Sequence, residues 1–487
     1  MEHRRRLKTA ATVSTTTLND LPEDILRHII SFLPTTLDAV KTTLISQKWR
    51  GLWRSLTSLN FNIDTFPTHN SFIDQILRFG SFVTQTLRLR HPSAPLRSFV
   101  IRYAYVSHRY AEFVDFWIRY AVSHGASFLD VDLNKENYLA VVAGDLEEEE
   151  DGNDCGAVVA DEDYDSDGDE NHELWYDFDF GVLGSSCVTN LKLRESKLLL
   201  PDMTTLDIGL QFGSIRSLLL DKVYMTDQVV SDLMSCCVNL EALELSRIHG
   251  IEDVKLRSFT LTELSLKHWD LGKSVEILAP KLSLLVMAAF EAEEYIFTDV
   301  SGLVEARITS IYYEDWSKVV RLLTQVQHLV VQNSWFELLL SEKLLSDSFR
   351  FPNLKVLQLR TGYSKCEILG LGALLECCPN LETLSLLTLT NWFEEEHIPK
   401  ELLQRPKHFS LPCLKQVLVH NYMDTEEEQQ VVALLKEQGA ILQDVILSRG
   451  DESEVPRKSI KQPFGQLDYL IADMLESIFD KSSFRNS

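Results

Sequence analysis

A short apolar pattern returns thirteen times along the chain and leaves few folds open to it. Each copy has an apolar residue, two others, an apolar residue, one other and a third apolar residue. The copies are Leu96/Phe99/Ile101, Phe128/Val131/Leu133, Val188/Leu191/Leu193, Ile215/Leu218/Leu220, Leu240/Leu243/Leu245, Leu261/Leu264/Leu266, Leu282/Leu285/Met287, Leu303/Ala306/Ile308, Val326/Leu329/Val331, Leu354/Leu357/Leu359, Leu381/Leu384/Leu386, Leu414/Val417/Val419 and Leu442/Val445/Leu447. From Leu191 onward, successive middle residues lie 27, 25, 21, 21, 21, 23, 28, 27, 33 and 28 residues apart.

This spacing is typical of a leucine-rich-repeat solenoid, in which each unit contributes one short strand and one helix or irregular segment. Each unit buries its apolar residues against its neighbours, so the array forms one continuous core. A gap of 60 residues separates Val131 from Leu191, and it contains a 35-residue acidic run whose removal leaves a spacing of 25. Unrelated strand–helix pairs would not keep such a register. We therefore predict an α/β fold with parallel strands on the concave face of a solenoid.

Residues 18–61 predict a separate unit of three short helices ahead of the repeats. Asn19 and Asp20 are expected to cap the first helix, and Pro34 to end it. The second and third helices are expected at about residues 38–45 and 47–56. The first helix carries two neighbouring stripes of apolar residues. Together with the apolar residues of the other two helices, this is more apolar surface than about 40 residues can bury alone. The segment is therefore either a helical cap on the next domain or a docking face for a partner's helices.

Alternate strand positions point out of the core, onto the concave sheet face. These positions are mixed in charge with a slight basic excess, which favours a protein partner with an acidic patch. The candidate target-binding residues on this face are Lys192, Arg194, Glu244, Lys267, Arg307, Gln332, Gln358, Arg360 and His420.

The acidic run at residues 145–179 contains 17 Asp and Glu residues and no Lys or Arg. This composition predicts a disordered insert between repeats. Residues 163–168 match the opening of a calcium loop, but the twelfth position is Leu174 instead of a bidentate Glu, so no calcium site is expected. Ser166 has acidic neighbours on both sides and is a candidate phosphorylation site.

The net charge of −25 argues against nucleic acid or an anionic membrane as the main partner. No apolar run reaches the length of a membrane helix. Residues 1–17 are predicted to be a disordered basic tail. They do not resemble a secretory signal, because no apolar segment follows the basic residues. The tail is either a nuclear signal or simply solvated, so we expect a location in the nucleus, the cytoplasm or both. The 8 cysteines lack metal or disulfide spacing and favour a reduced compartment.

The sequence contains no phosphate-binding loop, dinucleotide fingerprint, nucleophile elbow or zinc-protease motif. The adjacent pairs Cys236/Cys237 and Cys377/Cys378 occur at the same point of two repeats, and we interpret them as buried thiols rather than metal ligands. No catalytic residue, metal site or cofactor is predicted, and we do not expect an enzyme.

The C-terminal part of the chain has two expected pieces. Residues 408–448 predict a strand, a helix and a strand that complete the solenoid, with Thr425 capping the helix and acidic residues in its first turn. Residues 449–487 are predicted to form a C-terminal tail. Between 464 and 479 its apolar residues recur at the helical period, which predicts an amphipathic helix. Because a solenoid needs a terminal cap, we expect this amphipathic helix to supply it.

Two of these segments resemble known domains. The sequence LPEDILRHIISFLP, followed by LISQKWRGLW, resembles the F-box, with its Leu-Pro opening and the W-x-x-L-W ending of plant F-box proteins. The strand–helix–strand at 408–448 resembles the plant FBD region, which follows leucine-rich repeats. In this order the chain resembles plant F-box/FBD/leucine-rich-repeat proteins, with an F-box at 18–61 and repeats at 62–407.

The resemblance implies a non-catalytic substrate-recognition subunit of an SCF-type ubiquitin ligase. In that family the F-box docks a Skp-type adaptor, which joins cullin and RING subunits, and the repeats recruit a protein target. The alternatives are an adaptor-binding protein without a ligase role and a small-molecule or hormone receptor on the same solenoid. The F-box pattern falls on residues that face either the adaptor or the repeats, and the sequence does not divide them: Leu21, Pro22, Ile25, Leu26, Ile29, Phe32, Leu33, Val40, Leu44, Trp49, Leu52 and Trp53.

Overall fold

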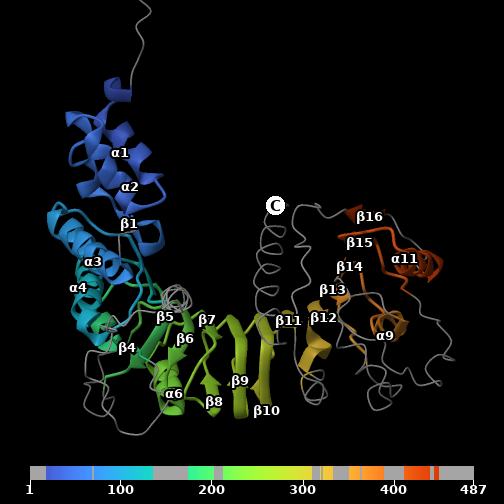
Figure 1. Ribbon diagram of the computed structural model, residues 1–487. Helices are drawn as coiled ribbons and strands as arrows, with labels where there is room; N and C mark the ends of the chain where they lie inside the picture. The colour runs from blue at the N-terminus through green and yellow to red at the C-terminus, as the bar shows by residue number, and fades with distance from the viewer. Residues whose placement is uncertain are drawn as a thin grey trace, which may run out of the picture. The chain divides into compact units, whose positions relative to one another are not determined.

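The computed structural model describes ten segments of the chain, which are residues 18–67, 71–134, 174–201, 212–309, 319, 322–332, 350–361, 365–388, 411–438 and 444–448. The chain forms two compact units (Figure 1). The first comprises Met1–Tyr176 with Ser185–Arg194, and the second comprises Asp177–Gly184 with Glu195–Ser487. Among the described residues, no helix combines the length and hydropathy that a membrane span requires.

The first unit begins with two short α-helices and several single turns of 3-10 helix. They are η1 (Leu18–Asp20), α1 (Glu23–Ser31), α2 (Thr36–Lys41), η2 (Thr42–Leu44), η3 (Gln47–Trp49) and η4 (Leu52–Ser55). The expected third helix is therefore two separate turns. Gly51 divides them with a φ of +81°, a conformation that glycine adopts at little cost. The expected capping by Asn19 and Asp20 is wrong, because Pro22 precedes α1 and the other two residues form η1.

A parallel sheet follows in the same unit, in the order β1-β2-β3-β5. Its strands are β1 (Ser58–Asn62), β2 (Ser98–Arg102), β3 (Phe128–Asp132) and the first half of β5 (Asn190–Leu199). Helices α3 (Phe72–Leu89) and α4 (Ala111–Ser123) connect β1 to β2 and β2 to β3, and they run side by side along the sheet (Figure 1). The backbone N–H of Asn60 on β1 donates to Thr36 Oγ1 of α2 at 2.8 Å. The N-terminal helices therefore close the edge of this sheet.

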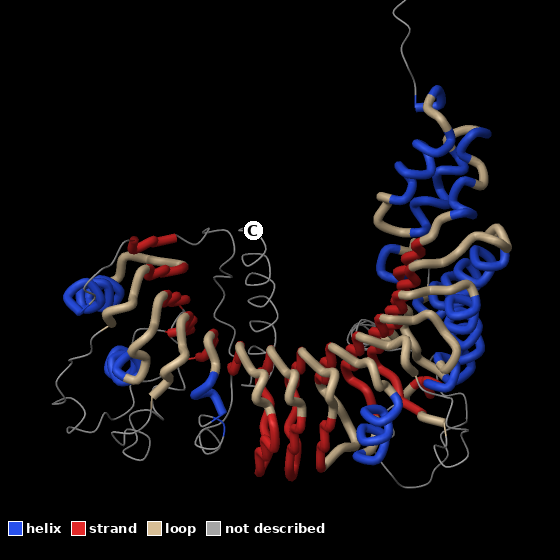
Figure 2. The backbone as a smooth tube through the Cα atoms, turned by 180° about the vertical axis from the view of Figure 1, so that it is seen from behind, coloured by secondary structure: helices blue, strands red, loops and turns tan. Residues whose placement is uncertain are grey.

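The second unit contains a longer parallel sheet, which Figure 2 shows as a row of neighbouring strands. Its order is β6 (Ser217–Tyr224), β7 (Ala242–Ser246), β9 (Glu263–Leu278), β10 (Leu284–Asp299), β11 (Glu305–Thr309), β12 (His328–Gln332), β13 (Val356–Thr361), β14 (Thr383–Thr388), β15 (Gln416–His420) and β16 (Asp444–Ser448). Strand β8 (Asp253–Arg257) pairs with the second half of β9. Further short elements are η5 (Ile63–Thr65), η6 (His108–Tyr110), β4 (Tyr176–Asp179), η7 (Phe180–Leu183) and η8 (Leu323–Gln325).

The register of the sheet follows the apolar pattern and confirms the predicted solenoid. In the second unit, the middle residue of each copy pairs with the middle residue of the next, from Leu218 on β6 to Val445 on β16. The predicted frame is wrong in one copy, because Phe99 pairs with Leu129 instead of Val131. The correct frame is Ala126/Leu129/Val131, and both it and the predicted frame have apolar residues at all three positions.

Repeat length decides which element comes after each strand. The longer repeats carry the helices α6 (Asp227–Cys236), α9 (Lys365–Glu376) and α11 (Glu426–Gln438). The three consecutive repeats of 21 residues instead carry β8 and the outer halves of β9 and β10. After its strand and turns, a repeat of 21 residues has few residues left to form the outer layer of the solenoid. Extended backbone covers more than twice the distance per residue that a helix does, so these repeats form a second strand segment instead.

The acidic insert ends earlier than predicted. Residues 145–173, with Ser166 among them, lie outside the described residues, but the expected disorder of residues 174–179 is wrong because they include β4. Tyr176 and Phe178 are buried while Asp177 and Asp179 are exposed. This alternation is the pattern of a half-buried strand. The high density of acidic residues led to the prediction of disorder instead.

Six of the described turns out of the sheet reuse one strained backbone position. The residue two places after the third apolar residue has a φ between +47° and +56° in six repeats, at Glu195, Lys222, Arg247, His268, Ala289 and Asn421. For residues other than glycine this left-handed conformation costs about 1–2 kcal/mol, because Cβ approaches the neighbouring carbonyl oxygen. The solenoid therefore stores local strain at a fixed point of its repeat.

Ala289→Gly tests this strain with one substitution. The change removes the Cβ contact but adds backbone entropy to the unfolded chain, so we expect a net gain of about 0.5–1 kcal/mol in the free energy of unfolding. Urea denaturation measures it. Ala288→Gly is the matched control, since Ala288 has ordinary strand backbone and should lose stability. Equal losses for both variants would show that position 289 is not strained.

Candidate interaction surfaces

Five large apolar side chains of the first unit are exposed on its N-terminal helices. They are Leu18, Ile25, Phe32, Leu44 and Ile45, with exposed fractions between 46% and 86%. We call this set the N-terminal apolar face. Ile25 and Phe32 are seven residues apart and so lie on one side of α1. Leu18 precedes Asn19, whose Oδ1 accepts from Ser46 Oγ at 2.9 Å, beside Leu44 and Ile45. Exposed apolar groups at this density mark an interaction site.

A buried core supports this face and separates the predicted F-box positions into two groups. Leu26, Trp49, Leu52 and Trp53 are at most 5% exposed, so these F-box positions belong to the core of the protein and not to its exposed face. Leu26 on α1 and Leu52 and Trp53 on η4 are buried because these two elements pack against each other. Pro22 is exposed, and the half-buried positions of the set are Leu21, Ile29, Leu33 and Val40. Leu18 and Ile45 were missed, since neither falls on the expected helical stripes.

Polar contacts of the core hold the face in place. Trp49 Nε1 donates to Asn19 Oδ1 at 2.9 Å. Lys48 Nζ donates to the carbonyl oxygens of Asn19 and Leu21, at 2.7 and 2.5 Å. These bonds tie η1 and the start of α1 to η3, so the exposed side chains stand on a fixed scaffold.

The second candidate surface is the open sheet face, which we define as the strand positions that point away from the core. In the second unit the predicted Glu244, Lys267, Arg307, Gln332, Gln358 and His420 lie there and are half-buried. Arg360 also lies there but is only 7% exposed. It is therefore less accessible to a target than its place among the candidate target-binding residues implied. Burial lowers the pKa of His420, whose Nε2 lies 3.1 Å from Ser385 Oγ.

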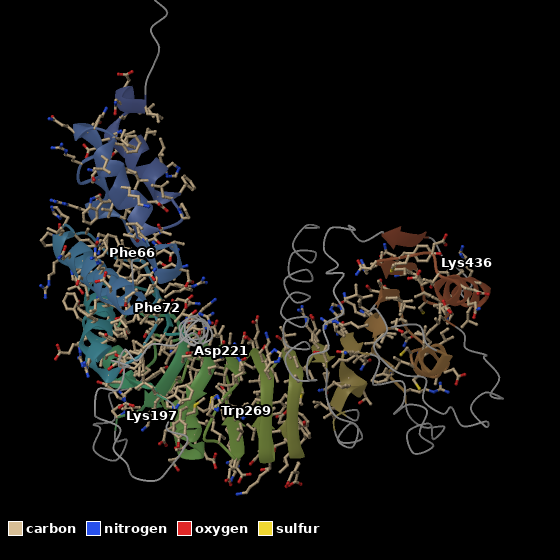
Figure 3. The ribbon with its side chains drawn as sticks, viewed as in Figure 1. Phe66, Phe72, Lys197, Asp221, Trp269 and Lys436 are labelled. Atoms are coloured by element: carbon tan, nitrogen blue, oxygen red, sulfur yellow. The ribbon has the colours of Figure 1, made fainter. Side chains whose placement is uncertain are left out.

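Ion pairs neutralise the expected basic excess of this face. Lys267 Nζ lies 3.3 Å from Glu244 Oε1, and Arg307 Nε lies 2.7 Å from Glu305 Oε1. Asp221, labelled in Figure 3, accepts two hydrogen bonds from Arg247 at 2.8 and 2.5 Å. The charges are matched within the sheet, so they do not favour an acidic target as the sequence indicated.

The same matching occurs on the sheet of the first unit. Arg194 Nη1 lies 2.9 Å from Asp130 Oδ1 and 3.8 Å from Asp132 Oδ2. Burial raises the pKa of Asp132, although the Arg194 charge lowers it in part. Lys192 Nζ lies 5.8 Å from the centre of the Phe128 ring, a cation–π contact. Both predicted basic residues are therefore engaged with their own sheet.

Comparisons with known proteins agree with this architecture. The family model described as the At1g61320/AtMIF1 LRR domain matches residues 171–438, and the F-box domain model matches residues 18–61. The chain is 25% identical to the F-box/FBD/LRR-repeat protein At1g78750 of Arabidopsis thaliana, over 89% of this chain and 90% of that protein. It is 24% identical to the FBD-associated F-box protein At1g66310 of the same plant, over 91% and 94%. This chain belongs to the plant F-box/FBD/leucine-rich-repeat family. Its N-terminal apolar face is therefore a face of the F-box.

The FBD-like region is fixed by a capping box at the start of α11. Glu428 is 1% exposed and its Oε2 accepts from the backbone N–H groups of Met423 and Thr425, both at 3.0 Å. In return the Glu428 N–H donates to Thr425 Oγ1 at 3.2 Å. The predicted cap at Thr425 is confirmed, and the acidic first turn includes a carboxylate with a structural role.

The paired cysteines lie in the core of the repeats. Burial raises the pKa of Cys236 to about 11 and that of Cys237 to about 12, and it also raises the pKa of Cys378 well above its usual range. Cys378 Sγ donates to the Leu374 carbonyl oxygen at 3.1 Å. Within the described ranges, no three His, Cys, Asp or Glu side chains come close enough to hold a metal.

These thiols predict a sharp reactivity contrast in the native protein. Cys187 is exposed, so iodoacetamide at pH 8 has direct access to its thiol and should alkylate it first. Cys236, Cys237 and Cys378 should react at least about a hundredfold more slowly, because the thiolate is the nucleophile and its fraction falls tenfold per pKa unit. Peptide mass spectrometry over time measures each site, and urea should abolish the difference. Fast native labelling of either pair would contradict their core position.

An F-box joined to leucine-rich repeats indicates a role of the substrate-receptor type in ubiquitin ligation. Proteins with this combination are typically non-catalytic, and their repeats serve protein–protein interaction.

Proposed function

We propose that this protein is the non-catalytic substrate-recognition subunit of an SCF-type ubiquitin ligase. The F-box docks a Skp-type adaptor, and through it the cullin and RING subunits, while the open sheet face of the repeats holds a protein target. The observation that carries the proposal is the N-terminal apolar face, which combines high exposure with a rigid support.

The energetics of this face favour a partner with an apolar surface. Burying one large aliphatic or aromatic side chain contributes roughly 1.5–3 kcal/mol relative to leaving it in water. Phe32 and Leu44 are 73% and 86% exposed, so nearly the whole of this gain is available to a partner. The hydrogen bonds at Asn19 order the face before binding, and pre-organisation lowers the entropy cost of association.

The open sheet face suits the second task for a different reason. Its side chains take no part in the apolar core, so they vary without disrupting the repeats. We place the target there, and the complex in the nucleus, the cytoplasm or both. The basic tail that motivates the nuclear location lies outside the described residues.

Titration of the full-length protein with a purified Skp-type adaptor tests the docking step. We expect a 1:1 complex by calorimetry, with a negative heat-capacity change from apolar burial. Absence of heat and of a complex on size exclusion, with correctly folded partners, would overturn the proposal.

A further inference from the structure

Strand β10 departs from every other strand of the second sheet on its open face. Three of its residues point away from the core there, and all three are apolar: Leu284, Val286 and Ala288. On each other strand from β6 to β16 along the sheet, at least two of the three corresponding positions are polar. Val286 and Ala288 are 8% and 4% exposed, a degree of burial that Ser246 and Ser385 on the same face share. We call these three residues the β10 strip.

The strip has the composition of a strand that is covered on both faces. Leu285 and Met287, between its members, are fully buried in the core. A continuous apolar run of this kind is typical of strands buried on both sides, whereas a solvated face alternates apolar with polar residues. Its neighbours in the register, Ser265 on β9 and Arg307 on β11, are polar. A narrow apolar band therefore lies on a face where every other strand is mainly polar.

The chain itself contains a segment that matches this band. Between residues 464 and 479, the residues Leu467, Leu470, Ile471, Met474, Leu475 and Ile478 recur at the helical period, with acidic residues opposite. Such a stripe on one side of a helix needs an apolar surface to cover it.

The connection is long enough to reach. Six strand spacings separate β16 from β10, or about 29 Å along the sheet at about 4.8 Å each. Residues 449–463, which follow β16, extend up to about 50 Å at about 3.3 Å per residue.

We propose that residues 464–479 pack in cis on the β10 strip. This placement differs from a cap on the last repeat, which was the expectation from the sequence. On the function proposed above, the segment would occupy part of the face that holds the target, so a target would have to displace it. The placement itself rests only on the strip, the amphipathic stripe and the reach of the connection.

Photo-crosslinking in the full-length chain tests the placement. Ser265→p-benzoylphenylalanine puts the probe on β9, beside Val286. After illumination and proteolysis, mass spectrometry should find an intramolecular cross-link to residues 464–479, independent of protein concentration. Thr298→p-benzoylphenylalanine is the matched probe on the exposed outer half of β10, and it should give none.

Substitutions in the segment complete the test without disturbing the sheet. Ile471→Glu with Leu475→Glu should reduce the cross-link from position 265 at least tenfold, whereas Ala472→Glu on the polar side should leave it unchanged. No cross-link to 464–479, or one insensitive to the double substitution, would overturn the placement. Adaptor binding by the same double variant is a separate readout, and its failure would concern the proposed function alone.

Discussion

Replacing Phe32 and Leu44 together by aspartate abolishes binding of a Skp-type adaptor and leaves the fold intact. Both side chains are more than 70% exposed in the free protein, so their loss removes no core contact. At an interface, a central apolar anchor typically costs about 2 kcal/mol or more when removed, and a buried aspartate adds a desolvation penalty. We expect at least a hundredfold loss of affinity by calorimetry, with an unchanged urea midpoint.

A matched pair of leucines in the same unit provides the control. Leu77 and Leu89 on α3 are 42% and 53% exposed but lie outside the N-terminal apolar face. Leu77→Asp with Leu89→Asp introduces the same charge and should leave the affinity within about twofold. If this control weakens adaptor binding as strongly as the F-box variant, the effect is electrostatic and the face is wrongly assigned.

Trp49→Ala destabilises the first unit and is not primarily a binding variant. Trp49 is 2% exposed and its indole N–H donates to Asn19 Oδ1, so truncation leaves a cavity and removes one of the two hydrogen bonds that this oxygen accepts. Large-to-small changes of this kind cost about 3–5 kcal/mol. We expect the free energy of unfolding of the first unit to fall by that amount, measured by urea denaturation with tryptophan fluorescence and circular dichroism.

The outcome distinguishes a core residue from a docking residue. Trp49→Phe keeps most of the volume and should recover most of the stability, while adaptor affinity stays near the unmodified value. A Trp49→Ala protein that unfolds at the original urea concentration but no longer binds the adaptor would place Trp49 on the interface, as the F-box pattern alone suggested.

The repeat architecture was accessible from the sequence because its signal is redundant. Each strand repeats the same three apolar positions, and the register from Leu218 to Val445 follows them. The frame of one copy was predicted wrongly, because Phe128/Val131/Leu133 and Ala126/Leu129/Val131 are both apolar at all three positions. Strand β8 and the outer halves of β9 and β10 were not predicted. The only sequence signal against a helix there is the short repeat length of 21 residues.

The division of the F-box into core and face was not accessible in the same way. Ile25 and Leu26 are adjacent and equally apolar, yet one is exposed and the other is buried. Composition and helical period are the same for the stripe with Ile25 and for the stripe with Leu26. Which stripe is buried depends on which of them packs against η4, and this contact is not visible in the sequence. Likewise, the charge pattern of the open sheet face appeared basic because the sequence does not show that Lys267 and Arg307 are paired with Glu244 and Glu305.

Affinity purification from plant cells tests the central claim most directly. The tagged full-length protein and its Phe32→Asp/Leu44→Asp variant are expressed at equal levels, and the bound proteins are quantified by mass spectrometry. We predict that the unmodified protein recovers a Skp-type adaptor together with cullin and RING subunits, and that the variant loses all three. Recovery of the adaptor without cullin, or of all three with the variant, would contradict a ligase receptor that docks through this face.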